Sequence, residues 1–211
     1  MYTVGTSFAR KGAVALYPDL SRAVRGMDAI LRQRMGIHEF TDDPLCLFRL
    51  ALTASPHPLL LSDGRLIDEG EEILELHLWN EHLPQIPASG PNTAWASLMK
   101  RRVRYSFMCV AAHLESERDL DGVGAVTGAP HFASRLGALQ MARTAERFGF
   151  DIMPTKGTAR LHGVVESLLA WTLTWAFNPA SLRTSNGLRP RYEIWISRDK
   201  FLRCYGTAAD P

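Results

Sequence analysis

A strand–turn–helix–turn–strand pattern between residues 123 and 153 constrains the fold of this chain more than any other feature. Residues 123–127 form a short run of small and β-branched side chains, entered through Gly122 and left through Gly128. The apolar face of the helix that follows consists of Phe132, Leu136, Leu139 and Ala142. Residues 150–153 predict a second strand. Such a unit implies a parallel pair of strands joined by a crossover helix.

Further strands are predicted on both sides of this unit. Residues 45–52 and 73–79 alternate along their length, and in the second run Leu74, Leu76 and Leu78 form the side that must face a core. An Asp-Gly step lies between the apolar runs 59–61 and 65–67, which predicts a hairpin because Gly supplies a positive φ. Residues 192–196 alternate as a last strand.

Long helices are predicted over residues 18–36, 93–114 and 161–177. Asn92 or Thr93 can cap the second of these. Its apolar face consists of Trp95, Met99, Val103, Phe107, Val110 and Leu114. The loop before it, residues 80–92, holds three prolines and a glycine and therefore cannot be regular.

This order of elements predicts an α+β fold with a mixed central sheet flanked by helices. We expect one domain over residues 1–211, with the helix and strand of residues 159–206 packed on the same sheet. The chain is 46% hydrophobic and 22% charged, with a net charge of +2, which disfavours disorder and gives no broad positive field for nucleic acid.

The cysteines and the N-terminus point to a reduced compartment. The three cysteines lie far apart without a C-x-x-C pair, so neither a disulfide framework nor a structural zinc site has support from spacing. Residues 1–19 lack a continuous apolar region, and the apolar stretch 164–177 contains Glu166 and is too short to span a bilayer. We expect a cytoplasmic protein.

The element order resembles that of the GNAT superfamily of acyl-CoA N-acyltransferases over residues 16–154. The stretch ALQMARTAERFGFDIMP, residues 138–154, is similar to the late helix of that family, which closes on Gly-Phe before the next strand. The resemblance implies that the strand at 73–79 leads through a loop into a helix whose N-terminus holds the pyrophosphate of the cofactor. Where that family has a glycine-rich R/Q-x-x-G-x-G/A loop, residues 85–92 read QIPASGPN.

A second resemblance covers most of the chain. Four stretches are similar to the YkoP-like domain, a bacterial family. They are LLLSDGRLIDEGEEILELHLWNEHL at 59–83, GVGAVTG at 122–128, ERFGFDIMP at 146–154 and SRDKFLRCYG at 197–206. Members of that family are sometimes found beside genes for cell-envelope polysaccharide or lipid enzymes. The hairpin Ser62-Asp63-Gly64, followed by Leu-His-Leu-x-Asn, is the most specific part. This resemblance implies no particular activity.

The densest polar cluster is His77, Asn80, Glu81 and His82. Glu75 lies on the same strand face as His77, and a carboxylate so near can hold one imidazole tautomer. One reading makes His77 a general base, with Glu75 orienting it and Asn80 polarising a reacting carbonyl. The structural alternative is that His77 and Asn80 bind the loop backbone and fix the end of the strand. The spacing of His77 and His82 fits no zinc motif, so we expect no metal.

A second candidate site precedes the helix at 93–114. Backbone N–H groups at Ser89, Gly90, Asn92 and Thr93 favour a phosphate or carboxylate, and Lys100 to Arg104 add positive charge two turns further on. The structural alternative is ordinary capping beside a solvated face.

Together these features lead to two hypotheses. The first is an acyltransferase-like enzyme that moves an acyl group from acyl-CoA, or another acyl donor, to a small amine or hydroxyl acceptor, linked to cell-envelope or lipid metabolism. The second is a non-catalytic interaction module that contacts envelope polysaccharide or lipid enzymes through the helix 164–177. The expected partners are a small-molecule acceptor and no nucleic acid; peripheral membrane contact and a homo-oligomer remain open alternatives.

Overall fold

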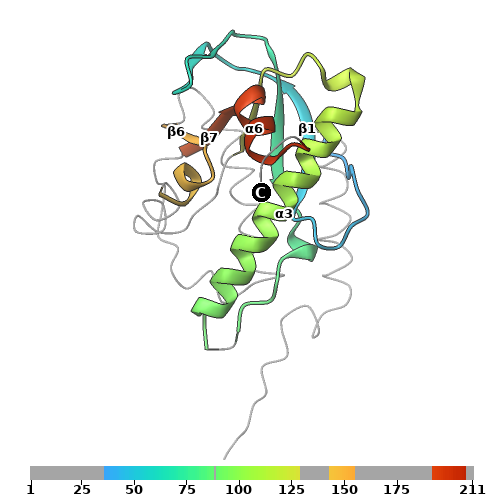
Figure 1. Ribbon diagram of the computed structural model, residues 1–211, viewed down its shortest axis with the longest axis vertical. Coiled ribbons are helices and arrows are strands. Elements are labelled where there is room, and N and C mark those ends of the chain that lie inside the picture. Colours follow the sequence, from blue (N-terminus) through green and yellow to red (C-terminus); the bar gives the residue numbers. More distant parts are fainter. Residues whose placement is uncertain (1–35, 88, 129–142, 155–191, 208–211) are drawn as a thin grey trace, which may run out of the picture.

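The computed structural model describes residues 36–87, 89–128, 143–154 and 192–207, and these contain a five-stranded mixed sheet (Figure 1). Its strand order is β1-β4-β5-β7-β6. The strands are β1 (Phe48–Ala54), β4 (Glu72–Leu78), β5 (Ala125–Gly128), β6 (Asp151–Pro154) and β7 (Tyr192–Ser197). β4 pairs antiparallel with β1 and parallel with β5, whereas β7 is antiparallel to both β5 and β6. The predicted α+β fold with a mixed sheet is therefore confirmed.

The prediction of a parallel pair within residues 123–153 is wrong in one respect. β5 and β6 run in the same direction, but they are not neighbours, because β7 lies between them and pairs with both. The parallel neighbour of β5 is β4 instead. A local sequence pattern predicts the direction of a strand. It does not reveal that a segment much later in the chain, here β7, pairs between the two strands.

The predicted hairpin is confirmed, although it stands outside the central sheet. β2 (Leu59–Leu60) and β3 (Leu66–Ile67) pair antiparallel as a separate two-stranded sheet. Gly64 in the turn between them has a φ of 86°, a conformation that other residues rarely adopt.

In the described part of the chain, two α-helices cover one face of the central sheet (Figure 1). The first, α3 (Thr93–Ser116), begins where expected, and the side chain of Asn92 accepts a hydrogen bond from Trp95 N–H at 2.9 Å. The second, α6 (Arg198–Tyr205), is capped by the Ser197 hydroxyl, which accepts from Lys200 N–H. Two short 3-10 helices, η1 (Asn80–His82) and η2 (Arg118–Leu120), follow β4 and α3.

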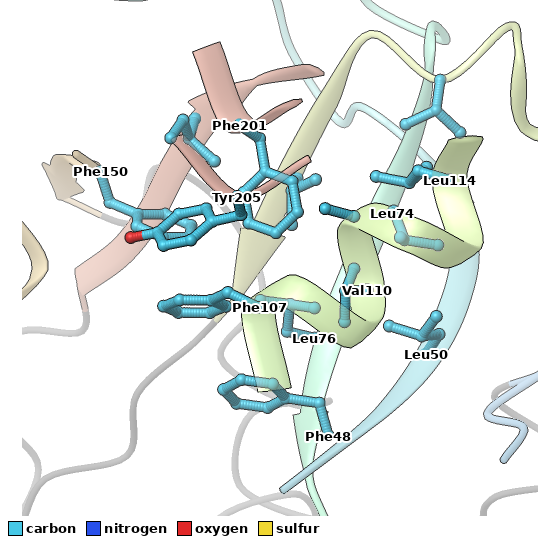
Figure 2. Packing of buried hydrophobic residues seen from close by; sticks show 14 of the residues in the cluster. Phe48, Leu50, Leu74, Leu76, Phe107, Val110, Leu114, Phe150, Phe201 and Tyr205 are labelled. Carbon is cyan, nitrogen blue, oxygen red and sulfur yellow. The ribbon is translucent and has the colours of Figure 1, made fainter. Parts of the chain in front are cut away.

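The main core lies between this sheet face and the helices, and Phe107 of α3 is at its centre (Figure 2). Its ring centroid lies 5.0–5.8 Å from five other aromatic rings. Those rings belong to Phe48, Phe148, Phe150, Phe201 and Tyr205. The sheet contributes Leu50, Leu74 and Leu76. The predicted core side of β4 is thus confirmed for Leu74 and Leu76 and wrong for Leu78, which lies at the end of the strand and is 48% exposed.

The opposite face of the sheet carries a smaller apolar cluster. Leu59, Leu61 and Ile67 of the hairpin region pack there against Ile73 and the fully buried Trp195. The hairpin therefore covers the end of this face where β4 begins, and the polar side chains of β4 lie further along the same strand.

Several predicted helices fall outside the described residues, namely 18–36, 161–177 and most of the helix before Gly149; residues 143–147 are helical. Of the C-terminal segment 159–206, the structure describes β7 and α6. Among the helices in the described part of the chain, none combines the length and the apolar character that crossing a membrane requires.

Replacing Phe107 with Ala should lower the free energy of unfolding by about 3–5 kcal/mol, because it empties the centre of the aromatic core. Met108 is the matched control, since it is the next residue along α3 and is 49% exposed. Met108→Ala should change stability by less than about 0.5 kcal/mol. Chemical denaturation followed by circular dichroism measures both, and equal losses in the two variants would contradict this account of the core.

Candidate functional site

A row of polar side chains crosses the sheet face that α3 and α6 do not cover. Glu75, His77 and Trp79 alternate onto this face because successive side chains of β4 point to opposite sides. The strand register places Arg49 of β1 directly opposite His77, and Thr127 of β5 opposite Glu75. Three strands thus bring a carboxylate, an imidazole, a guanidinium and a hydroxyl to one surface.

Arg49 is the buried cation of this row, with only 7% of its side chain exposed. Its guanidinium lies 3.0 Å from a Glu39 carboxylate oxygen and 3.6 Å from one of Glu81. It also lies over the ring of Trp79, 4.7 Å from the centroid. Two half-exposed carboxylates and an aromatic face therefore stabilise a charge that would be costly to bury alone.

His77 and Glu75 form the titratable pair of the row. His77 Nε2 lies 3.6 Å from Glu75 Oε2, and the two side chains are 21% and 32% exposed. His77 Nε2 itself is buried and has no hydrogen-bond partner among the described residues. The exposed part of the His77 side chain therefore lies away from Nε2, and Glu75 is the carboxylate beside that buried nitrogen.

Glu81 and His82, which belong to the same predicted polar cluster, contact residues other than His77. His82 stacks on Trp79 with centroids 3.7 Å apart, and its Nδ1 lies 2.7 Å from the carbonyl oxygen of Cys46. Glu81 pairs with Arg49, as described above. Asn80 begins η1, and its side chain lies outside the described part of the structure. His82, rather than His77, thus plays the backbone-fixing role that the structural alternative gave to this cluster.

The predicted donor-binding residues lie at the start of α3, whereas His77 lies on the face that α3 does not cover. Gly90 has a φ of 96°, and its N–H donates to the carbonyl of Pro87. Asn92 uses its side chain as the helix cap, while Ser89 and Thr93 are exposed. The capping alternative is confirmed for Asn92, and phosphate binding at this helix start remains a prediction.

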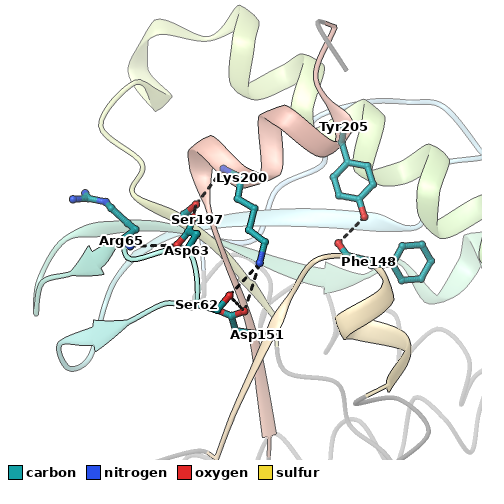
Figure 3. Close-up of polar contacts among 8 residues, drawn as sticks. All are labelled: Ser62, Asp63, Arg65, Phe148, Asp151, Ser197, Lys200 and Tyr205. Carbon is teal, nitrogen blue, oxygen red and sulfur yellow. Dashed lines mark hydrogen bonds and ion pairs between the residues drawn. The ribbon is translucent and has the colours of Figure 1, made fainter. Parts of the chain in front are cut away.

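Sequence reasoning missed a second polar cluster, which joins the hairpin to the far edge of the sheet (Figure 3). Asp151 of β6 accepts hydrogen bonds from the N–H and the hydroxyl of Ser62, at 2.6 and 2.5 Å. Lys200 of α6 lies 3.6 Å from the same carboxylate and 3.3 Å from Ser62 Oγ. The Ser197 hydroxyl donates to Asp63. We call these five residues the hairpin latch.

The hairpin latch connects three of the sequence stretches that carry the YkoP resemblance: 59–83, 146–154 and 197–206. Asp63 is the member with a shifted pKa. Burial opposes its ionisation, but hydrogen bonds from Ser197 and Arg65 N–H, together with Lys200, outweigh burial and lower the pKa of the Asp63 carboxyl. The shared motifs could have suggested that these segments meet, although not which atoms would.

Comparison with known families agrees with this convergence of motifs. A family model described as the YkoP domain matches residues 20–205, so the chain belongs to the YkoP domain family. No curated protein and no solved structure matches the chain. Within the described residues, no three His, Cys, Asp or Glu side chains are arranged to hold a metal ion.

The Asp63→Asn variant tests the hairpin latch through its pH dependence. Because the folded-state pKa of Asp63 is lowered, its stabilising effect is present above the unfolded pKa and is lost as pH falls through the folded value. The variant should therefore be less stable than wild type near neutral pH, and the gap should close below about pH 4. Urea denaturation across the acid range measures this gap.

Ser197→Ala is the companion variant, since it removes the same hydrogen bond. It also removes the cap of α6, which should add a loss of about 1 kcal/mol that does not depend on pH. A stability gap for Asp63→Asn that stays constant from neutral to acid pH would overturn the role given to this carboxylate.

Proposed function

We propose that this YkoP domain transfers an acyl group from a thioester donor to a small amine or hydroxyl acceptor, with His77 as the general base. The observation that carries the proposal is the pair of Glu75 and His77, which are the partly exposed members of a mostly buried polar row. His77 Nε2 is buried 3.6 Å from a carboxylate, while 21% of the whole side chain is exposed. That arrangement suits an imidazole oriented at one nitrogen and reactive at the other.

The roles of Glu75 and His77 follow from the burial of His77 Nε2 beside the carboxylate. Glu75 favours the tautomer that carries its proton on Nε2, so that Nδ1 keeps a lone pair. As the acceptor attacks the thioester carbonyl, its proton passes to Nδ1, the new C–N or C–O bond forms, and the C–S bond breaks. The leaving thiolate then takes up the proton from Nδ1, which restores the neutral imidazole. Glu75 stabilises the imidazolium that exists between these steps.

The sheet topology gives further support. β4 and β5 are parallel, and their described ladder ends at the pair Leu76 and Gly128, just before His77. Ligands of sheets with parallel strands gather beyond the carboxyl ends of those strands. β4 then leads through a loop into α3, which is the connection that the resemblance to acyl-CoA N-acyltransferases implies.

The residues proposed for the donor are those at the start of α3. Backbone N–H groups of Ser89 and Thr93 would face its phosphates, because the N–H of Gly90 already donates to the carbonyl of Pro87. Because the Asn92 side chain already accepts the N–H of Trp95, the phosphates are left with the other N–H groups of this turn. Asn80, as the next residue after Trp79, is proposed to polarise the reacting carbonyl.

The test is thiol release from acetyl-CoA in the presence of a mixed panel of small primary amines and amino sugars, with the products identified by mass spectrometry. Release should depend on the acceptor, and His77→Ala should slow it about 10²–10⁴-fold. Glu75→Gln should slow it less, because the imidazole remains. His57→Ala, in the loop before β2, is the matched control and should keep the wild-type rate.

Two outcomes would contradict the proposal. One is acceptor-dependent release that survives in His77→Ala. The other is no acceptor-dependent release and no binding of acetyl-CoA by calorimetry, which would leave the non-catalytic interaction module as the better account.

A further inference from the structure

The segment that leads into α3 and contains most of that helix has an unusual charge distribution. Residues 83–114 contain no Asp or Glu, although the whole chain has 22 of them and a net charge of only +2. The cations of this segment are Lys100, Arg101, Arg102 and Arg104, all within two helical turns. Positive charge is therefore concentrated on one part of one helix.

The same part of α3 is poorly buried. The buried residues of this 24-residue helix are Ser106, Phe107, Val110, Ala111 and Leu114, and all of them lie in its C-terminal half. Trp95, Met99 and Val103, which belong to the predicted apolar face, are only partly buried. The N-terminal half of α3, roughly 20 Å long, is thus held to the protein mainly by the other half.

Three of the four cations have no acidic partner among the residues that the structure describes. Lys100, Arg101 and Arg104 are exposed. No ion pair in the described part of the chain involves them. Arg102 differs, because it donates to the carbonyl oxygen of Pro44 at 2.9 Å and so helps to hold the chain before β1.

Apolar side chains share this surface. Tyr105 and Met108 are 38% and 49% exposed. Positions 101, 104, 105 and 108 follow the spacing of one helix face. The Tyr105 hydroxyl donates to Asp43 Oδ2 at 2.5 Å, which fixes the exposed ring on the helix. We call Lys100, Arg101, Arg104, Tyr105 and Met108 the basic face of α3.

We propose that the basic face of α3 binds the surface of an anionic lipid bilayer. Cations beside exposed aromatic and thioether groups are the composition of helices that lie in a membrane interface, where phosphates meet acyl chains. A second copy of the chain fits poorly, since a two-fold contact would set these cations against themselves. Nucleic acid would use the cations but would leave Met108 without a role. This inference does not depend on the proposed acyl transfer.

The experiment is co-sedimentation of the full chain with vesicles of equimolar phosphatidylglycerol and phosphatidylcholine, or of phosphatidylcholine alone. Wild type should bind the anionic vesicles only, and binding should weaken as salt rises. Each exposed cation is worth about fivefold in affinity, so Lys100→Gln/Arg101→Gln/Arg104→Gln should lose roughly 100-fold. The control variant Arg118→Gln/Arg147→Gln/Arg203→Gln removes three exposed cations elsewhere and should lose far less.

Met108→Gln reports the apolar contribution and should weaken vesicle binding severalfold without any change in charge. Free CoA at millimolar concentration should not displace the vesicles, which separates this surface from the donor site at residues 89–93. The proposal is overturned if the two triple variants bind anionic vesicles equally, if wild type binds none, or if wild type binds single-stranded RNA through these cations while it ignores the vesicles.

Discussion

The alternation of side chains along β4 is the constraint on which the rest of this structure depends. On one side of the strand, Leu74 and Leu76 pack with Phe107 of α3 in the main core. Because that side must be buried, Glu75, His77 and Trp79 are fixed on the opposite face. A shift of one residue in the register with β1 would put a carboxylate and an imidazole under α3. The stability of the core and the position of the candidate site therefore have the same origin.

Features that depend on neighbouring residues could be predicted from the sequence. The turn at Gly64 needs a positive φ, the start of α3 needs a cap such as Asn92, and the β4 alternation needs only a period of two. The α+β class followed from the order of such elements. The juxtaposition of Glu75 and His77 was also predictable, because residues two apart on a strand share a face.

Features that depend on pairing between distant segments could not be predicted. The insertion of β7 between β5 and β6 is one example, and the approach of Arg49 to Trp79 and Glu81 is another. The hairpin latch joins residues that are far apart in the chain: Ser62 and Asp151 are separated by 89 positions, and Asp63 and Ser197 by 134. Taken one at a time, the sequences around these residues indicate an ordinary turn, strand and helix start. The order of the strands in the sheet brings the polar residues of each cluster together. That order cannot be predicted from any short stretch of the sequence.

The proposed roles require that Glu75 holds the His77 imidazole with its proton on the buried nitrogen. Proton–nitrogen correlation spectra of the protein labelled with ¹⁵N-histidine report the tautomer of each ring directly, and the signal lost in His77→Ala assigns the residue. We expect a protonated Nε2 and an unprotonated Nδ1 in the neutral ring, and a mixture of tautomers in Glu75→Gln. A neutral ring that is protonated on Nδ1, or one that does not respond to the loss of the Glu75 charge, would contradict it.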